Sequence, residues 1–235
     1  MKVIAPEGCI LNPTRPAPVN ARQLTGHLLA GVIYKALVQA VPDKVIADCG
    51  GAPTMRSVYS GYKADGSRFS QILFASGGMG ATPISDGLPT TAFPTNAGAG
   101  SIEAFESIAP LIVWSKELRQ DSGGAGQFRG GLGQDCEVEV RSSGDVQLSV
   151  FSDRRKYPAE GLLGGKPGAT TSIELADGVK MHPKSRTVVK PGTRLLLRYA
   201  GGGGYGVPSA RDPQALKNDI RNGYVSQAAA QTDYA

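Results

Sequence analysis

The sequence predicts an α+β fold: a β-rich, glycine-dense domain with one long N-terminal helix and short C-terminal helices. Three observations support this prediction. A helical repeat of apolar residues extends over only one long segment, residues 21–41. Short segments that alternate apolar and polar residues fill the middle of the chain, as half-buried strands do. The chain also has 32 glycines and 16 prolines among 235 residues, which favours turns and closely approaching backbones.

The chain divides into four regions that we expect to form one structural domain. Hydrophobic residues make up 40% of the chain, which is enough for a sizeable core. The regions are an extended proline-rich arm, a mixed α/β region, a β-rich region and a helical tail, at residues 1–20, 21–120, 121–206 and 207–235.

Residues 21–41 are predicted to form an amphipathic helix. Apolar residues recur every fourth position and therefore share one broad face, which comprises Leu24, Leu28, Val32, Ala36 and Ala40 with Leu29, Ile33 and Leu37 beside them. Asn20 can cap the start of this helix, and Pro42-Asp43 ends it.

Strands are predicted in the mixed and β-rich regions, at residues 68–76, 110–114, 171–175, 187–189 and 194–199. The apolar stretch that ends at Trp114 is expected to be buried. Residues 136–141 and 146–151 both alternate apolar and polar side chains, and Ser-Ser-Gly-Asp separates them. This pattern predicts a β-hairpin.

The tail is predicted to return to helix. Asp212 is a candidate N-cap with Pro213 at the first helical position, and Gly223 is a candidate C-cap. Ser226 can then cap a last short helix at residues 227–232.

Composition excludes several classes of protein. The net charge of +5 is spread along the chain without interleaved aromatic residues, so nucleic-acid binding is not expected. Three cysteines without a CxxC pair favour reduced thiols and a cytoplasmic location. The N-terminus has no signal-peptide pattern, and no apolar run is long enough to span a membrane.

No metal site or nucleotide site is expected within this chain. His27 lies on the predicted helix and His182 in a loop, and neither has a second ligand at metal-binding spacing. The run Gly201–Gly206 satisfies G-x-G-x-x-G, but no helix follows it directly, so a dinucleotide site is rejected. Gly164-Gly165-Lys166 continues into Pro167 and is not a P-loop.

Two arginines and two carboxylates are the candidate substrate-binding or anion-binding residues. Arg129 and Arg154 stand beside glycine-rich loops, where a guanidinium can bind a carboxylate or a phosphate. Asp86 and Glu103 are candidate carboxylates for acid–base chemistry. The glycines themselves are interpreted as architectural, through positive φ angles and tight crossing of the backbone.

Several unusual segments follow one another in the chain, namely LNPTRPAPV, GGMGATPISDG, SIEAFE followed by Pro110, LRQDSGGAGQFRGGLGQ, SDRRKYPAEGLLGGKPG and GGGGYGVPSARDPQALKNDIRNGYVSQAAA. Their order resembles the hydantoinase B/oxoprolinase family. The resemblance covers nearly the whole chain. Two departures stand out. Family subunits are considerably longer, and their tail motif GGGGYGDP has an aspartate where this chain has Val207.

The resemblance implies a subunit of an ATP-dependent hydrolase that opens a cyclic amide such as a hydantoin, a lactam or 5-oxoproline. A hydantoinase A-type partner would bind ATP and Mg²⁺ and phosphorylate the carbonyl oxygen of the small-molecule substrate. A second chain would supply the N-terminal half of the B subunit together with its divalent metal, so the isolated chain is expected to be inactive. Two alternatives stay open, namely a subunit of an acetone or acetophenone carboxylase and a non-catalytic scaffold that completes a split subunit.

Overall fold

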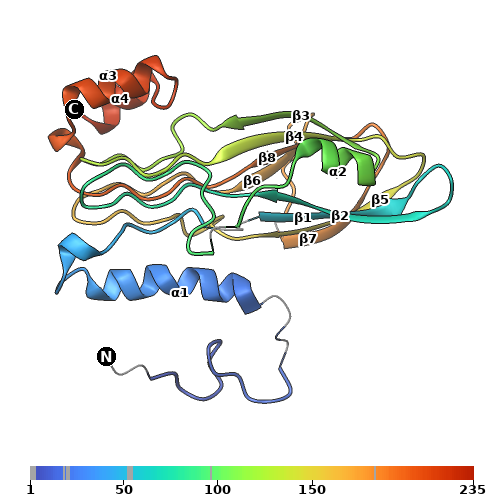
Figure 1. Ribbon diagram of the computed structural model, residues 1–235, viewed down its shortest axis with the longest axis horizontal. Coiled ribbons are helices and arrows are strands. Elements are labelled where there is room, and N and C mark those ends of the chain that lie inside the picture. Colours follow the sequence, from blue (N-terminus) through green and yellow to red (C-terminus); the bar gives the residue numbers. More distant parts are fainter. Residues whose placement is uncertain (1–3, 18, 20–21, 52–54, 96, 183) are drawn as a thin grey trace.

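The computed structural model describes residues 4–17, 19, 22–51, 55–95, 97–182 and 184–235, and it shows an α+β fold (Figure 1). A β-sandwich forms one end of an elongated molecule, and extended glycine-rich segments form the other end. Helix α1 (Arg22–Leu37) lies along these segments. Helices α3 (Pro213–Arg221) and α4 (Gln227–Asp233) lie at the end away from the sandwich. Two 3-10 turns, Pro42–Lys44 and Pro208–Ala210, complete this end.

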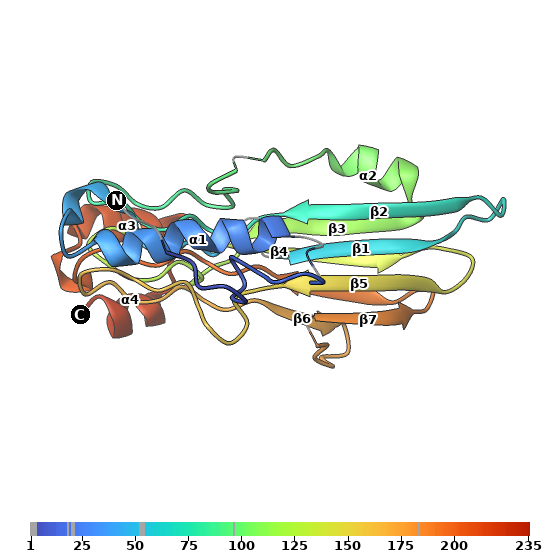
Figure 2. The ribbon, with the colours of Figure 1, turned by 90° about the horizontal axis from the view of Figure 1, so that it is seen from below.

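The sandwich consists of two four-stranded antiparallel sheets (Figure 2). The first sheet has the order β2-β1-β5-β7, with strands Arg68–Ala75, Met55–Tyr62, Val146–Ser152 and Lys184–Val189. The second has the order β3-β4-β8-β6, with strands Leu111–Leu118, Gln134–Val140, Arg194–Arg198 and Ser172–Leu175.

The main hydrophobic core lies between these sheets. Every second residue of a strand points inward, so the core takes alternate residues from both sheets, among them Tyr59, Leu148, Val138 and Leu195. Helix α2 (Ile102–Ile108) adds Phe105, whose ring packs edge-on against Tyr59 with 6.2 Å between the ring centroids.

The predicted hairpin is wrong. Strands β4 and β5 follow each other in the chain, but β4 pairs with β3 and β8, whereas β5 pairs with β1 and β7. The Ser-Ser-Gly-Asp connection therefore crosses from one sheet to the other. Alternation identifies a half-buried strand, but it does not indicate which neighbour that strand pairs with. Trp114 also differs from expectation, because its side chain lies on the outer face and is exposed.

The glycine-rich end is not built from strands. Its segments, which we call the glycine bundle, are residues 45–51, 76–90, 121–133, 159–169 and 199–206. Their hydrogen bonds run mainly between segments. A Cβ on Gly201 or Gly204 would overlap segment 122–125, one on Gly202 would overlap Met79, and one on Gly203 would overlap Glu160. Gly201 and Gly204, which are three residues apart, therefore face the same neighbouring segment. A repeat of three residues is that of a polyproline II helix, which has three residues per turn.

The segment at residues 199–206 occupies the centre of the bundle. Its amide groups donate hydrogen bonds to three neighbouring segments, and its carbonyl groups accept hydrogen bonds from two of these and from a fourth. The partners of Gly202, Gly203 and Gly204 are Gly131, Asp48, Lys166, Gly124, Ala81 and Leu162, at distances of 2.8–3.0 Å. A strand in a sheet forms backbone hydrogen bonds with at most two neighbouring strands, whereas this segment forms them with all four other segments of the bundle. Such packing is possible only where side chains are missing.

Of the two architectural roles expected for the glycines, tight crossing of the backbone is therefore more common here than a positive φ angle. Among the glycines of the glycine bundle, only Gly51, Gly164 and Gly206 have a positive φ, of 94°, 94° and 72°. The others are needed because another backbone lies where a Cβ would be, as at Gly131, whose Cβ would overlap the carbonyl oxygen of Leu88. The predicted β-rich region at residues 121–206 is accordingly part sandwich and part glycine bundle.

Helix α1 is shorter than predicted and faces the bundle with only part of the predicted apolar face. It ends at Leu37 instead of residue 41, and Val32, Ala36 and Ala40 are exposed. Tyr34 and Leu37, with Val38 and Val41 beyond the helix, pack on a small cluster around Val45. Leu37 belongs to the predicted face, whereas Tyr34 was not predicted, and its large aromatic ring buries more apolar area than the alanines do. The predicted cap Asn20 lies outside the described residues.

The predicted tail is confirmed. The carboxylate of Asp212 accepts a hydrogen bond from the amide of Ala215 at 2.8 Å, and the hydroxyl of Ser226 accepts one from Ala229 at 3.1 Å. Gly223 follows α3 with φ of 74°. The same cap chemistry starts α2 at Ser101, although neither this helix nor strand β1 was predicted from the sequence.

Candidate functional site

The structure places Arg129 and Asp86 in a network of four charged side chains. Arg129 and Arg211 contact Asp86 and Asp219, and only Asp86 is substantially exposed. Arg211 binds the Asp86 carboxylate with both terminal nitrogens, at 2.8 and 2.7 Å, and reaches Asp219 at 2.6 Å. Arg129 donates from Nε to Asp219 at 3.1 Å. Two carboxylates therefore neutralise two guanidinium groups at the base of α3.

The charges in this network stabilise one another. Burial by itself would raise the pKa of Asp86, but the hydrogen bond and charge of Arg211, together with Arg129, hold this pKa below its usual value. Burial would lower the pKa of Arg211, and the two carboxylates outweigh that effect and raise it. Burial also raises the pKa of Tyr234, which lies against Arg211, to about 12. The network joins the C-terminal tail to the glycine bundle, and we interpret it as a structural brace.

Arg154 lies elsewhere, beneath helix α1. Its Nη2 donates to the carboxylate of Asp48 at 2.6 Å, and the same oxygen accepts a hydrogen bond from the Cys49 amide at 2.9 Å. Arg154 has a left-handed backbone with φ of 57°, an uncommon conformation for a residue with a side chain. Its Nε is buried and makes no hydrogen bond with the described residues.

A small cavity adjoins the Arg154–Asp48 pair. His27 and Tyr34 line it from α1, and Cys49 and Phe93 line it from the bundle side. Its volume of about 10 Å³ has room for roughly one water molecule. Burial raises the pKa of the Cys49 thiol to about 11, so the thiol is protonated at neutral pH. The polar groups here can bind a small anion only if α1 moves away.

Helix α1 approaches this pair closely because residue 31 is glycine. A Cβ on Gly31 would overlap the Asp48 carboxylate. Lys35 forms an ion pair with Glu160 on the same side of the helix. His27, which we expected on the helix surface, is half-buried against the cavity.

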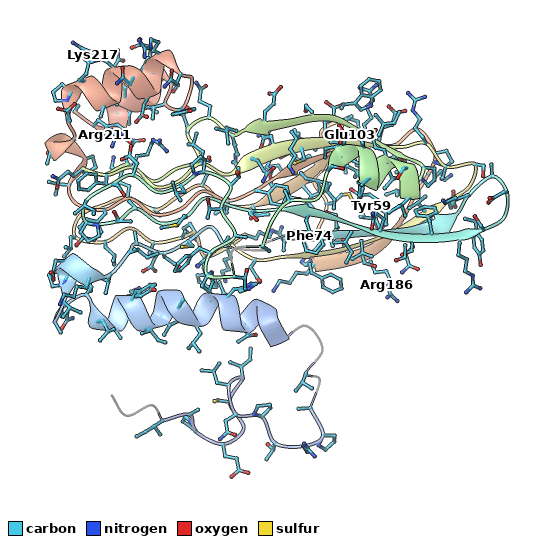
Figure 3. The ribbon with its side chains drawn as sticks, viewed as in Figure 1. Tyr59, Phe74, Glu103, Arg186, Arg211 and Lys217 are labelled. Atoms are coloured by element: carbon cyan, nitrogen blue, oxygen red, sulfur yellow. The ribbon has the colours of Figure 1, made fainter. Side chains whose placement is uncertain are left out.

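The structure does not bring Glu103 near the other candidates. Glu103 is exposed in the first turn of α2 on the sandwich, whereas Arg211, which binds Asp86, lies at the opposite end of the molecule (Figure 3). The nearby Glu106 accepts a hydrogen bond from the Val113 amide at 2.8 Å and so supports β3.

Three charged residues of these sites were not predicted from the sequence, namely Arg211, Asp219 and Asp48. Arg211 directly precedes the predicted cap Asp212, and Asp219 lies in the helix that Asp212 caps, which could have drawn attention to them. No spacing signal links Asp48 to Arg154, because the two residues lie in distant parts of the chain.

Among the residues that the structure describes, no group of three or more His, Cys, Asp or Glu side chains is placed to hold a metal ion. His182 is exposed, and its Nδ1 lies within hydrogen-bonding distance of the Lys184 backbone. The cysteines Cys9, Cys49 and Cys136 are all free. None of the described helices is long and apolar enough to cross a membrane.

Comparison with known families matches residues 1–208 to Hydantoinase B/oxoprolinase. The chain belongs to this family. It is 32% identical to the beta subunit of caprolactamase from Pseudomonas jessenii, over 98% of this chain and 42% of the relative. The crystal structure of the ATP-dependent caprolactamase from that organism superposes with a TM-score of 0.86 at 30% identity, over 99% of this chain and 42% of that chain.

Two further relatives indicate the range of the family. A protein of Pseudomonas sp. strain NS671, named for a D-/L-hydantoinase, is 30% identical over 100% of this chain and 40% of its own length. The acetone carboxylase alpha subunit of Xanthobacter autotrophicus is 28% identical over 66% of this chain and 25% of its own length. The chain thus spans about two fifths of the caprolactamase and hydantoinase relatives, and it is part of a hydantoinase B/oxoprolinase-family subunit.

Proposed function

We propose that this chain is part of the B or β subunit of an ATP-dependent enzyme that opens a cyclic amide such as a hydantoin, a lactam or 5-oxoproline. The observation that carries the proposal is the similarity to caprolactamase, because nearly the whole chain superposes at 30% identity. The hydantoinase relative supports the same class of ring-opening reaction.

The proposed enzyme divides its work among chains. ATP and Mg²⁺ are bound by an A-type subunit, and a further part of the B subunit supplies the divalent metal. This chain contributes the sandwich and the glycine bundle as a rigid support. Within it, Arg154 is the proposed contact for an anionic substrate or phosphorylated intermediate, since its Nε is a buried donor without a hydrogen bond to any described residue.

An ATP-dependent carboxylase is the second candidate, and the similarity to the acetone carboxylase alpha subunit favours it. Both reactions activate a carbonyl group with ATP, but they differ in the nucleophile. Water attacks in the hydrolase, whereas a carbon nucleophile attacks in the carboxylase.

The test is substrate-dependent ATP hydrolysis by the assembled enzyme. The assembly is incubated with ATP and either caprolactam, hydantoin or 5-oxoproline, and in a parallel series with acetone or acetophenone and bicarbonate. Release of ADP coupled to a ring-opened product supports the hydrolase; this product is an amino acid from caprolactam or 5-oxoproline and an N-carbamoyl amino acid from hydantoin. Coupling to a carboxylated ketone would favour the carboxylase instead, and turnover with neither series would favour a scaffold role for this chain.

A further inference from the structure

The outer faces of the two sheets differ in charge. Strands β3, β4, β8 and β6 carry both signs, and their charges pair on the face itself. Arg194 contacts Glu137 and Glu139, each at 3.1 Å, and Trp114 donates from its indole to Glu139 at 2.7 Å. Arg194 also stacks on the Trp114 ring, 4.6 Å from its centroid. These four side chains therefore pair with one another on the face itself, in contact with water.

The outer face of the other sheet has a different chemistry. Strands β1, β2, β5 and β7 contain four basic residues and no aspartate or glutamate. Large apolar side chains on the outer face are between 42% and 60% exposed. We call this surface the aromatic-basic face, and it comprises Tyr62, Phe74, Phe151, Val188, Arg68 and Arg186.

The strand register places these side chains together. Tyr62 of β1 lies opposite Arg68 of β2, and Phe151 of β5 lies opposite Lys184 of β7, so these aromatic side chains have basic neighbours on this side of the sheet. Arg186 and the half-buried Val58 lie on the same side, with Ser149 of β5 between them. Figure 2 shows the four strands from this side, largely without a helix in front of them. Among the described residues, no carboxylate pairs with Arg186 or Arg68, although Lys184 at the edge pairs with Asp153 at 2.9 Å.

We propose that the aromatic-basic face is a docking surface for an acidic protein surface, supplied by the part of the family-length subunit that this chain lacks. Exposed aromatic side chains beside arginines that pair with no described carboxylate have the composition of a protein interface. The charge partners would come from outside the sheet, so the occupant presents carboxylates around an apolar centre. The chain spans about two fifths of its hydrolase relatives, which leaves the larger part of such a subunit as the source.

Two other occupants fit less well. A second copy of this chain would bring like charges together across a twofold axis, because the same patch meets itself there. Nucleic acid would be attracted by the arginines, but it would leave the aliphatic Val58, Ile72 and Val188 without apolar partners.

The experiment is hydroxyl-radical footprinting, which reports the solvent exposure of individual side chains. The isolated chain is compared with the assembly formed by this chain and the rest of the subunit. We expect oxidation of Tyr62, Phe74 and Phe151 to fall several-fold in the assembly. Oxidation of Trp114, which is similarly exposed on the opposite sheet, should not change. Equal oxidation of the three aromatic residues in both samples would overturn the proposal.

A charge reversal tests the electrostatic half of the proposal. Arg186→Glu should weaken binding of the rest of the subunit and restore oxidation of Phe151, whereas Lys217→Glu on the exposed side of α3 should do neither (Figure 3). Equal binding by both variants contradicts the proposal, as does protection of the face by double-stranded DNA in place of the subunit.

This inference rests on the proposed function for the identity of the occupant, and the readouts separate the two. If the assembly protects the face but opens no ring, the docking surface is supported and the hydrolase function is contradicted. If the assembly is active but leaves the face exposed, only the docking surface is contradicted.

Discussion

Arg129 and Arg154 differ in how many partners within the described part of the chain their guanidinium groups contact. Arg129 donates to Asp219 and to the carbonyl oxygen of Gly130, and its guanidinium lies over the Tyr224 ring. Among the described residues, Arg154 has an ion pair with Asp48 and a buried Nε without a hydrogen bond. A buried donor that lacks a partner costs folding free energy, which makes Arg154 the better candidate for a ligand contact.

Arg154→Lys is expected to separate function from stability. Lysine can keep a charge near Asp48 but cannot reproduce the planar guanidinium, so turnover of the assembled enzyme should fall while the melting temperature stays nearly constant. Arg155→Lys, at the exposed neighbouring position, is the matched control and should change neither. A melting temperature that falls together with activity would show that Arg154 only braces its loop.

Gly131→Ala should have the opposite signature. Its Cβ would overlap the carbonyl oxygen of Leu88, and such overpacking costs about 1–3 kcal/mol of unfolding free energy. Gly98→Ala adds the same methyl group where no described atom lies within 4 Å, so it should leave stability unchanged. Urea denaturation of the two variants checks this, and equal midpoints would contradict the close packing at Gly131.

At the scale of secondary structure, the charged network makes attachment of α3 dependent on pH. The pKa of Asp86 is lower in the folded chain than its usual value of 3.8. The carboxylate therefore contributes its full stabilisation above pH 3.8, and this contribution is lost as the pH falls through the lower folded-state pKa. Protonation would remove the negative partner of Arg211.

Asp86→Asn tests that contribution. Melting temperatures measured from neutral pH down to about pH 2 should fall less steeply for the variant, because asparagine has no proton to gain. Asp65→Asn removes a carboxylate whose pKa is also lowered, but by hydrogen bonds from Ser67 on an exposed turn, so it should flatten the curve less than Asp86→Asn does. Parallel curves for the wild-type chain and Asp86→Asn would rule out the network as the source of acid sensitivity.

Sequence patterns predicted those elements whose signals are local. Asp212 and Ser226 cap the tail helices as expected, because a cap depends on neighbouring residues only, while Gly223 directly follows the C-cap Asn222 with a positive φ. Strand positions were largely found by alternation, but the pairing of β4 and β5 was not, since it depends on distant strands. The threefold repeat of the glycine bundle leaves no apolar pattern to detect. Of the candidate site, the Arg129–Asp86 contact was not foreseen, because it depends on how the bundle folds.

At the scale of the whole molecule, the isolated chain is expected to be catalytically silent. It spans about two fifths of the caprolactamase and hydantoinase relatives, and the proposed ATP and metal sites belong to other parts of the enzyme. Purified alone, it should show no ATP-dependent hydrolysis of caprolactam or hydantoin above background, although its circular dichroism spectrum is that of a folded protein. Robust ring opening by the chain alone would refute this division of labour.

The position of residues 199–206 at the centre of the glycine bundle has a consequence for biosynthesis. A ribosome makes the four surrounding segments first and the central one after them. The strands that the structure describes, the last of which ends at Arg198, emerge before this segment. We therefore expect the sandwich to form on the ribosome. The other segments of the glycine bundle, the first of which begins near Val45, can pack only after the central segment has left the exit tunnel. During that interval their backbone amides are bound to water. Nascent-chain quality control therefore encounters a molecule in which the sandwich is folded and the glycine bundle is not.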